Sequence, residues 1–121
     1  MSLANYLGIE QQEISRSKVI LTLPVTDKVL QPFGLLHGGV NAVLAEEAAS
    51  LGAMARLDAS HVAVGVDITT HHFRPVTSGR LTATAVPENV GKTLQTWRVE
   101  VRLGSKLTSI STVTLAVRER Q

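Results

Sequence analysis

The sequence predicts an α+β domain in which one long helix packs against an antiparallel sheet of about five strands. One segment, residues 40–57, carries apolar residues at helical spacing, and five other segments show the apolar–polar alternation typical of strands. Short turns separate the last four of these segments, and short connections favour antiparallel neighbours. The chain has 121 residues, so we expect residues 1–121 to form a single domain with one core.

The first predicted strand is residues 18–25, in which alternate residues are apolar. Pro24 has no backbone N–H to donate, which places it at the end of the strand or the strand at a sheet edge. Residues 26–39 contain one proline and three glycines, so we expect a loop there. The residues that share the apolar face of the strand are Val19, Leu21, Leu23 and Val25.

Residues 40–57 are predicted to form the long helix. Six alanines lie between positions 42 and 55, and alanine combines the highest helix propensity with little bulk. The only charged side chains before Arg56 are Glu46 and Glu47. A helix with so few charges is predicted to be buried on several sides. Its larger apolar residues are Val40, Val43, Leu44, Leu51 and Met54.

The rest of the chain is predicted to form four strands joined by tight turns. In the third of them, Trp97 and Val99 alternate with Arg98 and Glu100, so one face is apolar and the other is charged. The predicted strands are residues 62–76, 80–86, 94–103 and 107–117, with turns at residues 77–79, 87–91 and 104–105.

Composition excludes several classes of protein. The chain has no cysteine, which rules out disulfides and thiolate metal ligands. No segment approaches the roughly 20 apolar residues of a membrane span. The first residues lack the basic and then apolar pattern of a secretory signal, so we expect a cytoplasmic protein without a membrane partner. Nucleic acid is not an expected partner either, because the chain has no Lys/Arg cluster and no aromatic stacking platform.

Two features of the composition point to other partners. Only 3% of the residues are aromatic, so the core must be built from small aliphatic side chains. Oligomerisation is a common remedy for such a core, and we expect a homo-oligomer. The net charge is +2, but most of the basic residues lie in the C-terminal half. That half can attract an anionic ligand, or it can simply form a solvated strand surface.

The most unusual residues gather where the predicted helix begins. Gly38 and Gly39 stand at its start, where backbone N–H groups lack intrahelical partners and the helix dipole is positive. Such a terminus can polarise a carbonyl oxygen, and it is equally compatible with an ordinary glycine-rich helix entry. Glu46 and Ser50 are four residues apart and share a helix face, which is either apolar or solvated. Glu47 is the glutamate expected to face solvent.

Three other chemistries find no support in the sequence. No His-Glu-x-x-His motif is present, and the side chains of His71 and His72 are expected to point to opposite faces of a strand, so no metal site is predicted. No Gly-x-Ser-x-Gly elbow exists for a serine nucleophile. Residues 91–93 resemble the end of a P-loop but lack its first glycine.

Two segments resemble the hotdog-fold acyl-CoA thioesterases. Residues 31–39 read Gln-Pro-Phe-Gly-Leu-Leu-His-Gly-Gly, and Glu46 follows nine positions after His37. This is similar to the family's Gln-Pro-x-Gly-x-x-His-Gly-Gly motif, above all in the branch of the Arthrobacter-type 4-hydroxybenzoyl-CoA thioesterase. The segment also resembles the enterobactin-pathway proofreading thioesterase, the 1,4-dihydroxy-2-naphthoyl-CoA hydrolases and the phenylacetate-degradation-type thioesterases. Residues 71–76, followed by Gly79, resemble the family's strand with His-x-x-Pro and a basic residue. The resemblance implies a single hotdog domain, with a long central helix wrapped by an antiparallel sheet.

The same resemblance implies an activity and the residues that perform it. The chain would hydrolyse an acyl-CoA thioester to the free acid and CoA, without a metal and without a cofactor beyond the CoA of the substrate. Glu46 would act as nucleophile or general base, and the Gly38 N–H would polarise the thioester carbonyl. Gln31 and His37 would orient the thioester, while Ser50 would hold the water.

In such proteins the site lies between two subunits, so Glu46 of one chain would face Gly38 of another. We therefore expect at least a dimer, with a tetramer favoured. The candidates for the nucleotide of CoA are His72, Arg74, Lys92 and Thr93. The candidates for the acyl pocket are Phe33, Leu51 and Met54, whose apolar side chains suit an aryl or a medium-chain acyl group.

Two alternative functions remain open at this point. One is a hotdog enoyl-CoA hydratase or dehydratase, which also uses a carboxylate but with a differently placed histidine. The other is a non-catalytic acyl-CoA-binding sensor, although such sensors regulate a DNA-binding module that this sequence does not show. The spacing of His37 and Glu46 fits hydrolysis better than hydration, and the presence of Glu46 favours an enzyme over a sensor.

Overall fold

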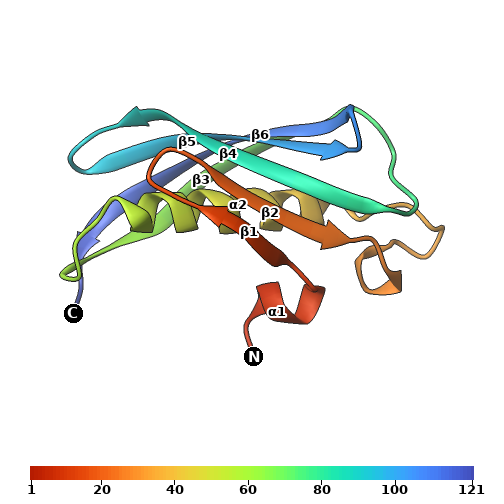
Figure 1. Cartoon of the computed structure of the whole chain (residues 1–121), viewed down its shortest axis with the longest axis horizontal. Coiled ribbons are helices and arrows are strands. Elements are labelled where there is room, and N and C mark those ends of the chain that lie inside the picture. Colours follow the sequence, from red (N-terminus) through yellow and green to blue (C-terminus); the bar gives the residue numbers. More distant parts are fainter.

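The computed structural model describes residues 1–121 and sets one long helix, α2 (Gly38–Ala55), against a single antiparallel sheet. The sheet curves over α2, which lies along its concave face (Figure 1). The strands are β1 (Glu10–Ile14), β2 (Val19–Pro24), β3 (His61–His72), β4 (Arg80–Val90), β5 (Leu94–Leu103) and β6 (Lys106–Glu119). Their order across the sheet is β1-β2-β4-β5-β6-β3, and all neighbouring pairs are antiparallel. The α+β prediction is thus confirmed.

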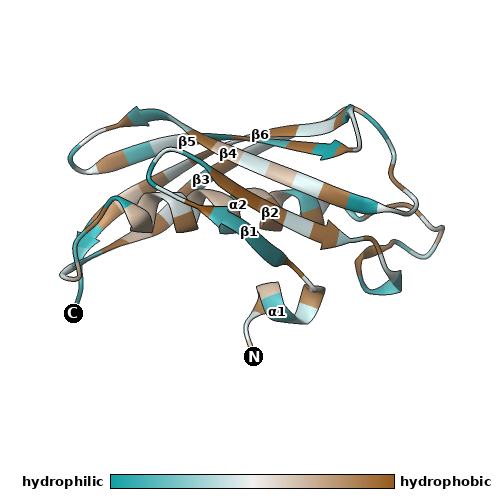
Figure 2. Cartoon of the chain, viewed as in Figure 1, coloured by the Kyte–Doolittle hydropathy of each residue, from teal (hydrophilic) through white to brown (hydrophobic).

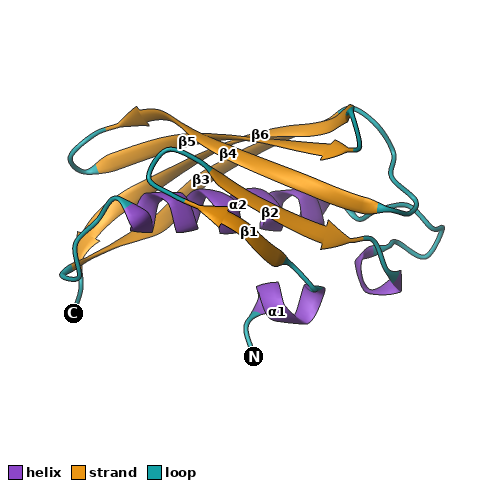
Figure 3. Ribbon diagram, viewed as in Figure 1, coloured by secondary structure: helices purple, strands orange, loops and turns teal.

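Two short helical segments complete the chain, α1 (Leu3–Leu7) and a 3-10 turn (Asp27–Val29), which the sequence patterns did not predict (Figure 3). Each is too short to show a helical period of apolar residues. None of the helices combines the length and the hydrophobicity that crossing a bilayer requires.

The sheet has six strands, and the prediction of about five missed β1. All five residues of β1 are exposed, so the strand carries no apolar face and no alternation to detect. Its polar sequence is visible as a hydrophilic arrow at the edge of the sheet (Figure 2). The strand forms because its backbone pairs with β2, and polar side chains add to this pairing: Gln12 Nε2 donates to Thr22 Oγ1 of β2 at 3.0 Å, and Glu10 forms an ion pair with Arg80 of β4.

Several predicted boundaries are wrong: α2 ends at Ala55 rather than at residue 57, and β3 ends at His72 rather than at residue 76. Two further errors have local reasons. Helix α2 begins at Gly38 rather than at residue 40, because Gly38 and Gly39, which were expected in the loop, belong to its first turn. Strand β4 continues to Val90 through the turn expected at residues 87–91. A register shift between Pro87 and Asn89 lets the strand continue past a residue that cannot donate a backbone hydrogen bond.

The core lies between α2 and the sheet. Helix α2 contacts all six strands, and its Ala45, Ala48, Ala49 and Ala53 are fully buried. The expectation of a helix buried on several sides is therefore confirmed for the face toward the sheet. Small side chains let the helix approach closely, and the largest buried ring, Trp97 of β5, packs directly against Gly52. A Cβ atom added to Gly52 would lie 2.4 Å from the nearest ring carbon of Trp97.

Gly52→Ala is therefore expected to destabilise the fold although alanine is the better helix former. The methyl group would overlap a fully buried ring, and overpacking of this kind costs about 1–3 kcal/mol, which exceeds the gain of roughly 1 kcal/mol in helix propensity. Thermal unfolding followed by circular dichroism should show a lower Tm. If the contact is the cause, the double variant Gly52→Ala/Trp97→Phe should lose less than the sum of the two single changes.

Candidate active site

The first turn of α2 presents one backbone N–H group without an acceptor. His37 caps the helix: its Nδ1 accepts from the Gly39 N–H at 3.1 Å, and its carbonyl oxygen accepts from the Val40 N–H at 2.9 Å. The Gly38 N–H donates to no atom of the chain. The positive end of the helix dipole strengthens the attraction between this N–H group and a negative or polarised oxygen. An unpaired N–H is thus present at Gly38, the residue for which the family resemblance implies a carbonyl-polarising role.

A cavity of about 250 Å³ opens beside this helix terminus. Its lining brings together Gln31, Gly38, His72 and Arg74, four of the residues that the sequence proposed, and adds Asn41. A turn holds Gln31 in place: its N–H donates to the Leu35 carbonyl oxygen at 2.7 Å. Residues from the loop, the helix and the end of β3 therefore converge on one site.

His72 lies closer to the helix terminus than the sequence suggested. The sequence assigned it to the CoA nucleotide, but its Nε2 would be 3.0 Å from a Cβ atom built on Gly38. Asn41 Nδ2 approaches His72 Nδ1 at 3.1 Å on the other side of the ring. The lack of a side chain at position 38 thus leaves room for an imidazole beside the unpaired N–H.

Glu46 lies two turns further along α2, outside the cavity. Its side chain is exposed, whereas that of Glu47 is half-buried, so the prediction that Glu47 is the solvent-facing glutamate is wrong for a single chain. The reason is that the sheet covers the opposite side of α2, and Glu46 projects over the edge strand β3. A Cβ atom on Gly65 of β3 would come within 2.6 Å of Glu46 Oε2. Ser50, half-buried, is one turn away on the same face.

Within one chain the carboxylate and the polarising N–H are far apart. Glu46 follows Gly38 by eight positions on one straight helix, a rise of about 12 Å. The candidate residues thus fall into two groups: the helix-terminus group of Gln31, Gly38 and His72, and the carboxylate group of Glu46 and Ser50.

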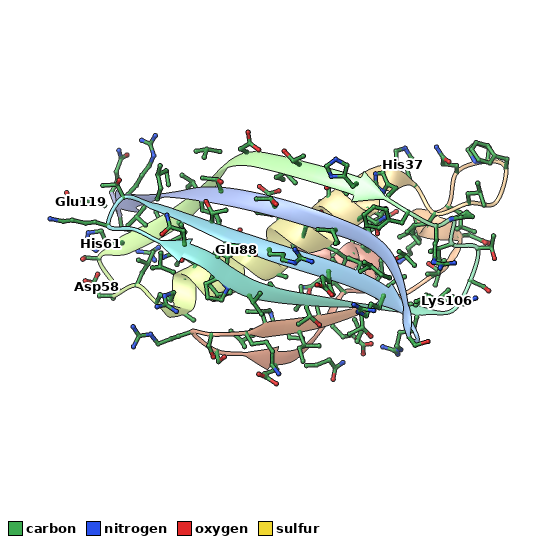
Figure 4. The ribbon with its side chains drawn as sticks, turned by 90° about the horizontal axis from the view of Figure 1, so that it is seen from above. His37, Asp58, His61, Glu88, Lys106 and Glu119 are labelled. Carbon is green, nitrogen blue, oxygen red and sulfur yellow. The ribbon has the colours of Figure 1, made fainter.

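The other residues proposed from the sequence do not join the cavity. Lys92 and Thr93 form the turn between β4 and β5, where the Thr93 carbonyl oxygen accepts from the Val117 N–H at 2.8 Å. This is the end of the sheet at which Glu119 and His61 lie, opposite to His37 and Lys106 (Figure 4). The acyl-pocket candidates lie apart as well: Phe33 is 69% exposed on its loop, and Leu51 and Met54 are half-buried on α2.

Sequence reasoning missed a second cavity with two basic residues. This cavity, also about 250 Å³, is lined by Arg74, Pro75, Leu103, Lys106 and Thr108. It shares Arg74 and Pro75 with the first cavity, so the two adjoin. Neither Arg74 nor Lys106 forms an ion pair. No pattern in the sequence singled out Lys106, because its proximity to Arg74 arises from the pairing of strands distant in the sequence.

Two carboxyl groups with lowered pKa values lie outside both cavities. Hydrogen bonds from the Ser60 side chain and from His61 lower the pKa of Asp58 to about 2, and hydrogen bonds from Arg102 and Arg98 lower the pKa of Glu100. Ser60, His61 and Asp58 do not form a catalytic triad, because the serine and the aspartate both contact Nδ1 of the imidazole. These groups stabilise a turn and a strand surface. No cluster of three or more metal-ligating side chains exists in the chain.

Comparisons with known proteins agree with this fold and identify the family. The model of the thioesterase superfamily matches residues 33–110. The 1,4-dihydroxy-2-naphthoyl-CoA hydrolase of Listeria monocytogenes is 39% identical over 122 residues, covering 100% of this chain and 99% of that protein. A thioesterase from Haemophilus influenzae has a similar crystal structure, with a TM-score of 0.93 and 40% identity over 98% of this chain and 83% of its own.

A Staphylococcus aureus protein is known from two similar solved structures, each 30% identical to this chain, with TM-scores of 0.95 and 0.93. They cover 98% and 96% of this chain, and 100% and 98% of their own. One carries alanine in place of a glutamate and the other alanine in place of a glutamine fifteen positions earlier. The family match, the sequence identity over the full length and the shared architecture place the chain in the thioesterase superfamily of hydrolases, with the hotdog fold.

Proposed function

We propose that the chain hydrolyses an aryl- or medium-chain acyl-CoA thioester to the free acid and CoA. The observation that carries this proposal is the unpaired N–H of Gly38 at the start of α2, a residue that lines the same cavity as Gln31 and His72. A donor fixed in this way stabilises the oxyanion of the transition state without reorganisation. The Listeria relative, named for hydrolysis of a CoA thioester, supports the substrate class.

Glu46 supplies the attacking group in the proposed reaction. Its carboxylate either adds to the thioester carbonyl, forming an anhydride that water then hydrolyses, or takes a proton from a water that attacks directly. In both routes the C–S bond breaks, the thiolate of CoA leaves and the acid is released. Ser50 is placed to hold the water, and no metal or added cofactor takes part. The glutamine and glutamate exchanged in the Staphylococcus structures have the same separation as Gln31 and Glu46.

The substrate class is tested by measuring free thiol release from a panel of aryl- and alkyl-CoA thioesters. We expect steady turnover on part of the panel, unchanged by EDTA. Hydration of an enoyl-CoA without thiol release would instead identify a hydratase, and acyl-CoA binding without any turnover would identify a sensor. A preference for hydroxyaryl thioesters would indicate a substrate similar to the one for which the Listeria relative is named.

We also propose a homo-oligomer, at least a dimer and by expectation a tetramer, with the active site between subunits. Strand β3 supports this, because it pairs only with β6 and leaves its other edge unpaired. Val66 on this strand is 55% exposed, and Glu46 projects over the same strand. A second β3 across a two-fold axis would cover this edge and bring a second helix terminus toward Glu46. Light scattering at micromolar concentration should give at least twice the 13.0 kDa monomer mass.

The second cavity is the proposed site for the phosphates of CoA. Arg74 and Lys106 carry unpaired positive charges next to the thioester cavity, so Lys106→Ala is expected to raise KM for an acyl-CoA about five- to tenfold with little change in kcat. The N-acetylcysteamine thioester of the same acid lacks the nucleotide, and its KM should not change. Lys92→Ala, measured in parallel, shows whether the opposite end of the sheet contributes across a subunit boundary.

A further inference from the structure

Asn41 is a polar side chain in an apolar part of the core. It is 4% exposed and lies on the face of α2 that also buries Leu44, Ala45 and Ala48. Its Oδ1 is one of only two buried side-chain atoms in the chain without a hydrogen-bond partner, the other being Ser109 Oγ. An amide with an unmet acceptor weakens a core, and an apolar side chain at this position would not carry this cost. Packing therefore does not account for this carboxamide.

The only partner of the Asn41 side chain is His72. Asn41 Nδ2 donates to His72 Nδ1 at 3.1 Å. The reverse orientation of the carboxamide would leave both N–H bonds of a buried amide unpaired, and unpaired buried N–H groups are rarer than unpaired carbonyls. Because Nδ1 accepts this hydrogen bond, the proton of the neutral imidazole is on Nε2.

The protonated nitrogen faces the cavity at the start of α2. Nε2 is the atom of His72 that would be 3.0 Å from a Cβ on Gly38, and Gly38, Asn41 and His72 all line the same cavity. His72 Nε2–H and the Gly38 N–H are then two donors beside one another. If the proton were on Nδ1, the Nε2 lone pair would face the developing oxyanion and repel it.

We propose that Asn41 is a positioning residue for the thioester site: it holds His72 in the tautomer and orientation that present Nε2–H beside the Gly38 N–H. The proposal rests on the proposed hydrolysis for its catalytic consequence, but not for the tautomer itself. Asn41 contacts no reacting atom in this role and acts through the imidazole, as an orienting partner does for a catalytic histidine.

The tautomer is measured by nuclear magnetic resonance on protein with ¹⁵N-labelled histidine, assigned with a His72→Gln variant. In the unmodified protein the proton of neutral His72 is expected on Nε2. In Asn41→Leu, which removes the donor but keeps the branched shape and the number of side-chain heavy atoms, we expect a mixture of both tautomers. A proton on Nδ1 in the unmodified protein, or an unchanged spectrum in Asn41→Leu, overturns the proposal. This result does not depend on enzymatic turnover, so it stays separate from a failure of the proposed function.

The kinetic consequence separates positioning from a structural role. Asn41→Leu is expected to lower kcat about tenfold or more while leaving Tm unchanged or higher, because an unmet buried acceptor is removed. Unchanged kcat overturns the catalytic part of the proposal. A matched control is Gln95→Leu, which removes another buried carboxamide, one that accepts from Trp97 Nε1 at 2.9 Å. This control should lower Tm and leave kcat and the His72 spectrum as they were.

Asn41→Asp provides a further test, the pH dependence of kcat, which a change in packing alone would not alter. The introduced carboxylate accepts from Nδ1–H, so neutral His72 loses its Nε2 proton and only the imidazolium still donates to the cavity. We therefore expect kcat of this variant to fall more steeply with rising pH than kcat of the unmodified protein. His37 at the helix cap and Arg74 in the cavity lining are the other ionisable groups around the ring, and the variant leaves both in place. An identical pH profile in both proteins overturns the proposal.

Discussion

Replacing Glu46 with glutamine is expected to lower kcat for thioester hydrolysis by about 10³-fold or more. The change removes the negative charge and the proton acceptor while keeping the size and the hydrogen-bonding capacity of the side chain. Glu46 is exposed and forms no ion pair or side-chain hydrogen bond in the chain, so Tm should stay within a degree or two of the unmodified protein. Thiol release and thermal unfolding on the same preparation test both expectations.

Glu47→Gln is the matched control for this experiment. Glu47 is the next residue of α2, and its replacement is the same change from glutamate to glutamine. Its side chain, however, points about 100° away around the helix. We expect it to keep kcat within a few-fold of the unmodified protein. Near-normal turnover in Glu46→Gln, or an equal loss in both variants, would remove Glu46 from the proposed mechanism.

The sequence predicted the strands whose residues alternate in polarity. The prediction missed the strand that is defined by its pairing with a neighbouring strand and shows no such alternation. The burial of Trp97, Val99 and Val101 of β5 follows directly from alternation with charged neighbours. Strand β1 shows the opposite case, because its exposed polar residues hold their place through backbone bonds to β2. Such a strand depends on what lies beside it, which no local pattern records.

The candidate site was predictable to a similar degree. His37 and Gly38 are adjacent, so the start of the helix could be recognised from a short segment of sequence. The structure adds that the His37 side chain caps the helix and that the Gly38 N–H is unpaired. Asn41 and Lys106 could not be found in this way. Asn41 reads as one polar residue in an alanine-rich helix, and its importance arises from His72, which is 31 positions away. Lys106 meets Arg74 only after the sheet has formed.

The proposed dimer explains why Glu46 is exposed in a single chain, which the sequence alone did not predict. A carboxylate that lies over the unpaired edge of β3 is solvated in one chain, but it becomes shielded when a second β3 pairs there. In the proposed dimer the low-dielectric surroundings of Glu46 are thus created by assembly, and folding of one chain does not supply them. Turnover per chain should consequently fall with dilution below the dissociation constant of the dimer.

Mixing two inactive variants is expected to restore activity if the site is shared between subunits. Gly38→Val crowds the helix terminus, where even a Cβ atom would lie 3.0 Å from His72 Nε2, while Glu46→Gln removes the attacking group. A mixed dimer then contains one site with both defects and one site with neither. Random exchange makes half of the dimers mixed, so turnover should rise from near zero to about a quarter of that of the unmodified protein. The chains are unfolded together and refolded in equal amounts, and each variant refolded alone serves as the control. If every site were built from one chain, each would keep its defect in any mixture and turnover would stay near zero.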